Sequence, residues 1–201
     1  MPKGSSGSIS AFIKGLLAHG GKSGASNPLD VTKLGNLEET ERLFRDRPVE
    51  NIAVFNDISK QPIAAATGDN HSVGVPNVSL SGTTLTHNHP DARWGGTMSY
   101  ADLHVLLQND VRSMRAIGRR GEGGYVFRQG SKPNASGLYN RVYQDRSLLD
   151  TRMRAAADAA RTAGRSAKEV RQAAVGVLHN YYAATAQQYG YVYRRRRQIG
   201  S

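Results

Sequence analysis

Residues 82–102 read GTTLTHNHPDARWGGTMSYAD, and this stretch contains the main evidence for the fold. Its first part alternates along the chain and is rich in threonine, which favours a strand that Pro90 ends. Ser99 then begins a predicted helix whose apolar positions form one stripe. These apolar positions are Leu103, Leu106, Leu107, Val111 and Met114. The stretch therefore predicts a strand, a loop and a helix in succession.

The strand carries two histidines that can bind a metal together. Alternate side chains of a strand point to the same face, roughly 6.6–6.8 Å apart along the backbone. His87 and His89 can therefore converge on one ion while Asn88 faces away. Asp102, in the first turn of the predicted helix, offers a third ligand, and three protein ligands would leave one position for water, as in catalytic zinc sites. Two simpler interpretations stay open: an ordinary strand, and a capping box in which Ser99 is the N-cap and Asp102 the third helical residue.

The flanking sequence predicts further elements of an α+β domain. A short amphipathic helix is expected over 37–45, with Leu37, Glu41 and Phe44 on one face. NIAVFN (51–56) and QPIAAA (61–66) read as a hairpin, and RAIG with YVFR as a second one. Two helices are expected at 141–163 and 167–189, before a C-cap at Gly190. The predicted divisions are a flexible Gly/Ser-rich leader (1–36), a core (37–130), a helical hairpin (138–190) and a basic tail (191–201).

Composition excludes several classes of protein. The 201 residues include no cysteine, so disulfides and thiolate metal sites are excluded. No apolar run approaches the roughly 20 residues that span a bilayer, and no Sec signal is recognisable, so we expect a soluble protein, cytoplasmic or exported by another route.

The net charge of +11 is concentrated at the C-terminus, where residues 151–201 hold ten basic and two acidic residues. Arginines 194–197 follow Tyr189, Tyr191 and Tyr193. This pattern suits stacking on bases and contact with phosphates, although a solvated tail explains it equally.

The motif H-x-H-P followed by S-x-x-D resembles the metal-binding signature of the JAB/MPN family of zinc hydrolases. The arrangement of residues 49–128, with VENIAVFN, TGDNHSV and LTHNHP followed by a helix, RAIG and YVFR, resembles the JAB-like domains of phage head-morphogenesis proteins and bacterial polymorphic toxins. The resemblance covers about 80 of the 201 residues. It implies a curved mixed sheet flanked by helices.

The resemblance also implies roles for individual residues. His87, His89 and Asp102 would bind Zn²⁺, and Glu50 would pass a proton from the attacking water to the leaving nitrogen. Ser99 would stabilise the oxyanion. The family usually has seven residues between the second histidine and the serine, whereas this chain has nine. Either the loop carries an insertion in which Trp94 forms a substrate lip, or the geometry is degraded and the site inactive; we favour the insertion because loops tolerate added length at little cost. Glu50 has a simpler interpretation as a solvated charge at the edge of a strand.

Three functions follow from these patterns. The first is a zinc-dependent peptidase or isopeptidase acting as a bacterial or phage-derived effector or toxin, with a protein or peptide substrate and an immunity protein as partner. The second is a nucleic-acid-binding protein or nuclease that uses Arg194, Arg195, Arg196 and Arg197. The third is a metal-free interaction module on a JAB-like scaffold.

Overall fold

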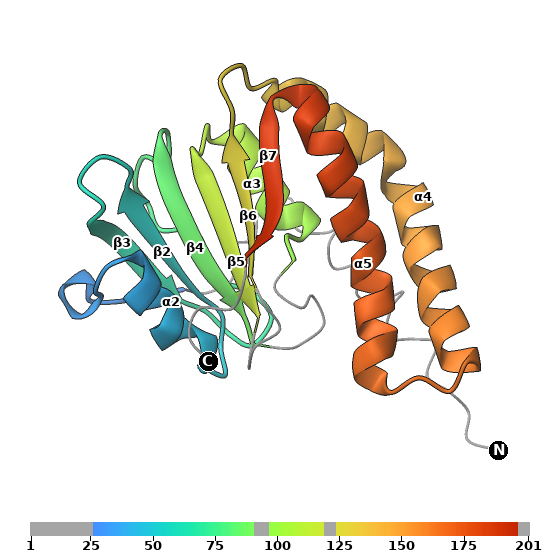
Figure 1. Cartoon of the computed structure of the whole chain (residues 1–201). Coiled ribbons are helices and arrows are strands. Elements are labelled where there is room, and N and C mark those ends of the chain that lie inside the picture. Colours follow the sequence, from blue (N-terminus) through green and yellow to red (C-terminus); the bar gives the residue numbers. More distant parts are fainter. Residues whose placement is uncertain (1–25, 91–96, 119–123, 197–201) are drawn as a thin grey trace.

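The computed structural model describes residues 26–90, 97–118 and 124–196. They form a mixed α+β fold around one seven-stranded sheet with the order β1-β3-β2-β4-β5-β6-β7 (Figure 1). The strands are β1 (Asn27–Pro28), β2 (Asn51–Asn56), β3 (Pro62–Thr67), β4 (Thr83–His89), β5 (Ser113–Gly118), β6 (Gly124–Gln129) and β7 (Tyr191–Arg196). The helices are α2 (Leu37–Arg45), α3 (Tyr100–Gln108), α4 (Ala135–Thr162) and α5 (Ala167–Thr185), with short 3₁₀ turns η1 (Val31–Lys33) and η2 (Ala186–Tyr189). The predicted fold class is confirmed.

The sheet separates two hydrophobic clusters because successive side chains of a strand point to opposite faces. On β2, Ile52 and Val54 join the larger cluster, whereas Ala53 and Phe55 join the smaller one. Helix α2 covers the smaller cluster with Phe44, as its predicted apolar face requires. Helices α3, α4 and α5 contribute leucines to the larger cluster. The two faces of the sheet are called the α2 face and the α3 face below.

An ion pair on the α2 face joins helix α2 to the sheet. Glu41 is 2% exposed and accepts a 2.9 Å hydrogen bond from the Arg115 guanidinium on β5. It also accepts a hydrogen bond from the Thr86 hydroxyl on β4. A buried carboxylate is tolerated because both partners compensate for its lost hydration.

Strands β4 and β5 are parallel neighbours, while every other pair in the sheet is antiparallel. Their parallel connection needs a crossover, and α3 supplies it. The predicted helix is confirmed, but it ends earlier than its apolar stripe suggested. Val111 lies between α3 and β5, and Met114 lies in β5. Both residues are buried. Apolar residues of a helix and of the following buried strand produced one continuous pattern in the sequence.

The C-terminal helical hairpin is present, and its first helix begins at Ala135, six residues before the predicted start. Helices α4 and α5 pack side by side next to β7, and their far ends extend beyond the sheet (Figure 1). Gly190 has a φ of +74° and ends η2 as predicted. A Cβ atom at Gly190 would lie 2.0 Å from the Lys132 carbonyl oxygen, so no other residue fits there without a backbone shift.

The predicted tail and leader both need correction. Residues 191–196 of the expected basic tail form β7, which pairs with β6 at the edge of the sheet. Tyr191 and Tyr193 are 2% and 8% exposed in the larger cluster, so neither can stack on a base. At the other end, part of the predicted leader is ordered as β1 and η1, and residues 1–25 lie outside the described residues.

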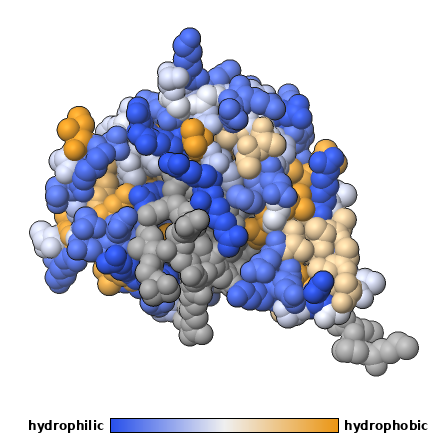
Figure 2. All heavy atoms as spheres, in the orientation of Figure 1, coloured by the Kyte–Doolittle hydropathy of each residue, from blue (hydrophilic) through white to orange (hydrophobic). Residues whose placement is uncertain are grey.

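No helix among the described residues is long and apolar enough to cross a membrane. In the orientation of Figure 1, the described surface is mostly hydrophilic, with small and separate apolar patches (Figure 2).

Candidate metal centre

The two histidines lie at the C-terminal end of β4, directly before the crossover to α3. His87 and His89 share the α3 face with Leu85, and each is 3% exposed. Asp102 lies in the first turn of α3. The carboxyl end of a parallel strand and the following helix N-terminus are a common place for ligands in α/β sheets. Here this junction brings the three predicted ligands together.

The three side chains converge on one point. Nε2 of His87 and Nε2 of His89 are 3.1 Å apart. The Asp102 carboxylate places Oδ1 3.2 Å from His87 Nε2 and Oδ2 3.5 Å from His89 Nε2. The imidazole rings meet edge to face with centroids 4.8 Å apart, so they do not stack. Among the described residues this is the group of three potential ligands close enough to hold a metal ion.

These separations match the dimensions of a metal site. Ligand atoms at about 2.0–2.1 Å from zinc in tetrahedral geometry are about 3.3 Å from one another. The 3.1 Å between the two nitrogens and the 3.2 Å from His87 Nε2 to Asp102 Oδ1 lie close to this value. With one ligand atom from each residue, the three atoms all lie within 4.8 Å of one another. If both rings are neutral with their protons on Nδ1, three lone pairs face one another in a buried space. A proton or a cation between them relieves that repulsion, and the residues present therefore fit a metal ion.

Charge around the site favours a cation. Burial opposes protonation of His87. The Asp102 carboxylate favours it through its charge and its hydrogen bond, and the charge of Glu50 adds to this effect. The pKa of His87 is therefore raised above 6.5. Burial likewise opposes ionisation of Asp102, yet His87 and His89 hold the pKa of this carboxyl well below its usual range. The site is thus a buried negative charge against two imidazoles, which can accommodate either a proton or a metal ion.

Asp102 also caps helix α3. Its Oδ2 accepts a 2.7 Å hydrogen bond from the Ser99 backbone N–H, and its own N–H donates to Ser99 Oγ. The predicted capping box is therefore confirmed. Capping occupies Oδ2, while Oδ1 lies closer to a histidine and remains available as a ligand. One carboxylate can therefore cap the helix and bind a metal.

Glu50 precedes β2 and lies on the same side of the sheet as the histidines. Ile52 pairs with His87 across the antiparallel β2–β4 ladder. Continuing this register by two residues sets Glu50 opposite His89, and directly opposed residues of a ladder share a face. The effect of Glu50 on the pKa of His87 agrees with this placement. The backbone of Glu50 is fixed on its other side by hydrogen bonds with Gly68 and Asp69.

Asn88 holds the start of β2 in place, a role that the sequence did not predict. Its Oδ1 accepts hydrogen bonds from the Asn51 backbone N–H at 2.7 Å and from the Asn51 side chain at 3.2 Å. Its Nδ2 donates to the Val49 carbonyl oxygen at 3.0 Å. Asn88 therefore binds both residues that flank Glu50. As predicted, its side chain faces away from the two histidines.

Of the remaining predicted site residues, only Ser99 lies at the site among the described residues. Ser99 is at the site as the N-cap of α3, and Trp94 lies outside the described residues. Arg194 and Arg195 are exposed on β7, Arg196 ends that strand, and Arg197 lies outside the described residues. His104 is exposed on α3, as expected from its position two residues after Asp102.

One buried atom at the site has no partner within the described residues: Nδ1 of His89. Ligation through Nε2 leaves the proton of a neutral imidazole on Nδ1, where it normally donates to an oxygen. Residues 91–96, which begin two positions after His89, lie outside the described residues.

Comparison of the chain with models of known families, with curated proteins and with solved structures finds no match.

Proposed function

We propose that this protein is a zinc-dependent hydrolase of peptide or isopeptide bonds, acting as an effector like the domains that its sequence resembles. One observation carries the proposal: two buried imidazole nitrogens lie 3.1 Å apart at a strand–helix junction, and the two oxygens of the Asp102 carboxylate lie 3.2 and 3.5 Å from them, one oxygen near each nitrogen. Three protein ligands of this kind are typical of catalytic zinc, which keeps a further position open. When bound, zinc supplies a Lewis acid that makes water acidic near neutral pH.

Glu50 is the proposed general base. It lies on the α3 face beside the histidines, and the register of β2 and β4 supports a position opposite His89. A carboxylate there can accept a proton from the attacking water and deliver it to the leaving nitrogen, which needs an amine proton to depart. Because Asn88 binds the residues on both sides of Glu50, it is a positioning residue for this base.

Ser99 is the proposed donor to the oxyanion. Its Oγ accepts the Asp102 backbone N–H, which leaves the hydroxyl proton free to donate to an oxygen next to the ligands. The helix N-terminus at Ser99 adds a positive partial charge on the same side. Both contributions favour a developing negative charge and are fixed before substrate binds.

Substrate would approach from the side of Asp102. The Asp102 side chain is 17% exposed, whereas the histidine side chains are 4% exposed. The two imidazoles thus form the floor of the site and the carboxylate lies nearer the surface. Trp94 lies outside the described residues, and its role as a substrate lip stays a prediction.

The experiment is a cleavage assay with zinc-loaded protein and a peptide library, with new termini read by mass spectrometry. The wild type should cleave a subset of peptides, and a chelator should stop it. Glu50→Gln should bind zinc as the wild type does but lose cleavage by about 10²–10⁴-fold. Equal cleavage by Glu50→Gln would contradict the assigned base.

Elemental analysis of the same samples identifies the metal. Two histidines and one carboxylate also suit ferrous iron, which supports oxygen chemistry rather than hydrolysis. Purification with iron in place of zinc, and no cleavage after zinc loading, would overturn the hydrolase proposal.

A further inference from the structure

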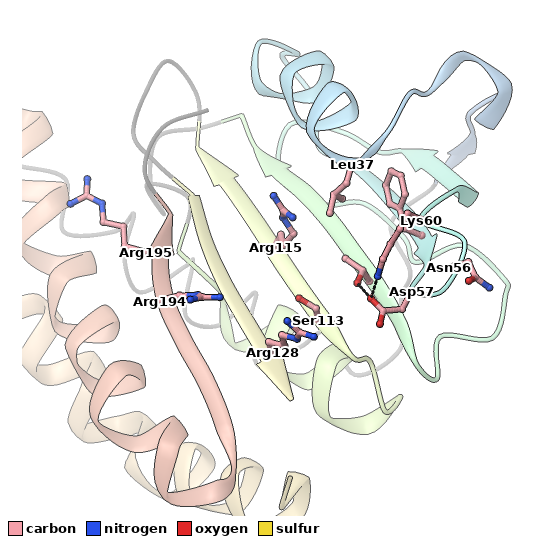
Figure 3. Close-up of a pocket in the computed structure, with 11 residues that line it drawn as sticks. Leu37, Asn56, Asp57, Lys60, Ser113, Arg115, Arg128, Arg194 and Arg195 are labelled. Atoms are coloured by element: carbon pink, nitrogen blue, oxygen red, sulfur yellow. Dashed lines mark hydrogen bonds and ion pairs between the residues drawn. The ribbon is translucent and has the colours of Figure 1, made fainter. Parts of the chain in front are cut away.

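A second site lies on the α2 face, on the side of the sheet opposite the candidate metal centre. It is a cleft of about 550 Å³, and five basic residues and one acidic residue contribute to its lining. These are Lys60, Arg115, Arg128, Arg194, Arg195 and Asp57. Figure 3 shows Arg115, Arg128 and Arg194 on three neighbouring strands, β5, β6 and β7.

Two of these cations already have partners in the fold. Lys60 pairs with Asp57 at 3.1 Å, and Arg115 pairs with buried Glu41. Arg128, Arg194 and Arg195 are exposed, and no carboxylate of residues 26–90, 97–118 and 124–196 lies within ion-pair distance of them. The charge of these three guanidinium groups is therefore available to a ligand.

The register of the strands fixes the spacing of the arginines. Arg128 pairs with Ser113 on one side and with Val192 on the other. Arg115 comes two residues after Ser113, and Arg194 comes two residues after Val192. Each is therefore a diagonal neighbour of Arg128, at roughly 7–8 Å between Cα atoms. Arg195 follows the opposite alternation and points away from the centre of the cleft (Figure 3). Arg115 is neutralised by Glu41, so Arg128 and Arg194 are the two uncompensated charges that the described residues place on this face, and they repel one another unless an anion lies between them.

The geometry points to a nucleic-acid duplex as the partner of this cleft, held through the phosphates of its backbone by Arg128, Arg194 and the Glu41-anchored Arg115. Arginine binds phosphate oxygens with two parallel hydrogen bonds, and rigid strands hold the guanidinium groups before binding. Three strands about 4.8 Å apart span about 10 Å, over which a duplex presents about six charges. The net charge of +11 adds long-range attraction for a polyanion.

The lining favours a duplex over the other partners with negative charge. A single strand is usually held by bases stacked on exposed aromatic rings. The aromatic residue of the lining, Phe55, is 2% exposed and belongs to the cluster beneath α2. An acidic protein partner would also need apolar anchors, and Leu37 packs against the same cluster.

The test is fluorescence anisotropy with a short labelled DNA duplex between about 50 and 200 mM salt. The double variant Arg128→Gln/Arg194→Gln should bind roughly tenfold to a hundredfold more weakly at about 0.1 M salt, and its log–log salt slope should fall by about 1.8. The control Arg152→Gln/Lys168→Gln removes the same charge from exposed positions on the helical hairpin and should keep the wild-type slope.

Three results would overturn the inference: no duplex binding at low salt, equal loss in both double variants, or tighter binding of polyglutamate or single strands than of the duplex. Circular dichroism checks that the variants fold. His89→Ala should bind the duplex as the wild type does, because the histidines lie on the other face of the sheet. Failure of the metal site therefore leaves this test intact.

Discussion

Asp102 provides the sharpest test of the candidate metal centre because it has two separable roles. It is the third residue of the capping box of α3, and it is the proposed carboxylate ligand next to His87 and His89. Asp102→Asn keeps an oxygen that can accept the Ser99 N–H but removes the negative charge from the site. The variant should therefore retain most of the helix cap and lose the metal.

The size of the effect follows from ligand linkage. Zinc at about 100 times its dissociation constant stabilises the wild type by about 2.7 kcal/mol. For a chain of 201 residues, this corresponds to a rise in melting temperature of about 5–10 °C. Loss of an outer hydrogen-bond partner weakens metal binding by about 10–100-fold, and loss of a charged ligand should cost at least the upper value. At the same zinc concentration, Asp102→Asn should then gain only about 0.4 kcal/mol, or about 1 °C.

The assay is differential scanning fluorimetry with and without zinc after chelator treatment. Helix α5 offers a matched control, since Glu169 caps Ser166 in the same arrangement but is exposed and away from any metal ligand. Glu169→Gln should keep the full zinc-dependent shift. The reasoning is refuted if Asp102→Asn shifts as the wild type does, or if the wild type does not shift at all.

Three further predictions follow from the site and its support. Metal affinity should increase as pH rises through and above 6.5, because the pKa of His87 is raised and a proton on His87 competes with the ion. In the metal-free protein, protonated His87 stabilises the folded state because its pKa is higher there than in the unfolded chain. This contribution is fully present below pH 6.5 and is lost as the pH rises through the pKa of His87 in the folded protein. The zinc-dependent increment in melting temperature should therefore grow over that range, and a shrinking increment would contradict the assignment. Asn88→Ala should reduce cleavage while zinc content stays near one per chain. The variant should also lower the free energy of unfolding by about 1–3 kcal/mol, because the Asn51 backbone N–H and the Val49 carbonyl lose a buried partner. A fall in zinc content alone, with full turnover per bound zinc, would count against a positioning role. Glu41→Gln should lower the free energy of unfolding by about 3–5 kcal/mol, because it leaves Arg115 without its buried carboxylate. Urea titration measures this change. A change below about 1 kcal/mol would show that water already screens this pair.

The strand–helix junction could be predicted because its signals are local. The alternation over 82–89 defines the face on which His87 and His89 lie, and Ser99 with Asp102 forms a capping box within four residues. The hairpins of β2 with β3 and of β5 with β6 also follow from short apolar runs next to turns. Each of these features depends on residues close in sequence.

Features that depend on distant partners could not be predicted in this way. The stretch YVYRRR looks like a basic tail, but pairing with β6 makes it a strand that buries Tyr191 and Tyr193 and exposes Arg194. Its alternation from tyrosine to valine to tyrosine was the available signal. Asn88 and Asn51 are 37 positions apart, so neither residue alone indicates that they bind each other.

The basic cleft has the same origin in long-range pairing. Arg115, Arg128 and Arg194 are scattered over 80 positions of sequence, and only the order β5-β6-β7 places them on one face. The concentration of charge at the C-terminus suggested an anionic partner, which stays a prediction. Its expected mode, stacking by tyrosines in a tail, is wrong because two of these tyrosines are buried.

The most direct test of the metal centre is X-ray diffraction from zinc-grown crystals at the zinc absorption edge. The account predicts one anomalous peak at about 2.0–2.2 Å from Nε2 of His87, Nε2 of His89 and an oxygen of Asp102. Crystals grown with zinc that show these three side chains without an anomalous peak between them would contradict it.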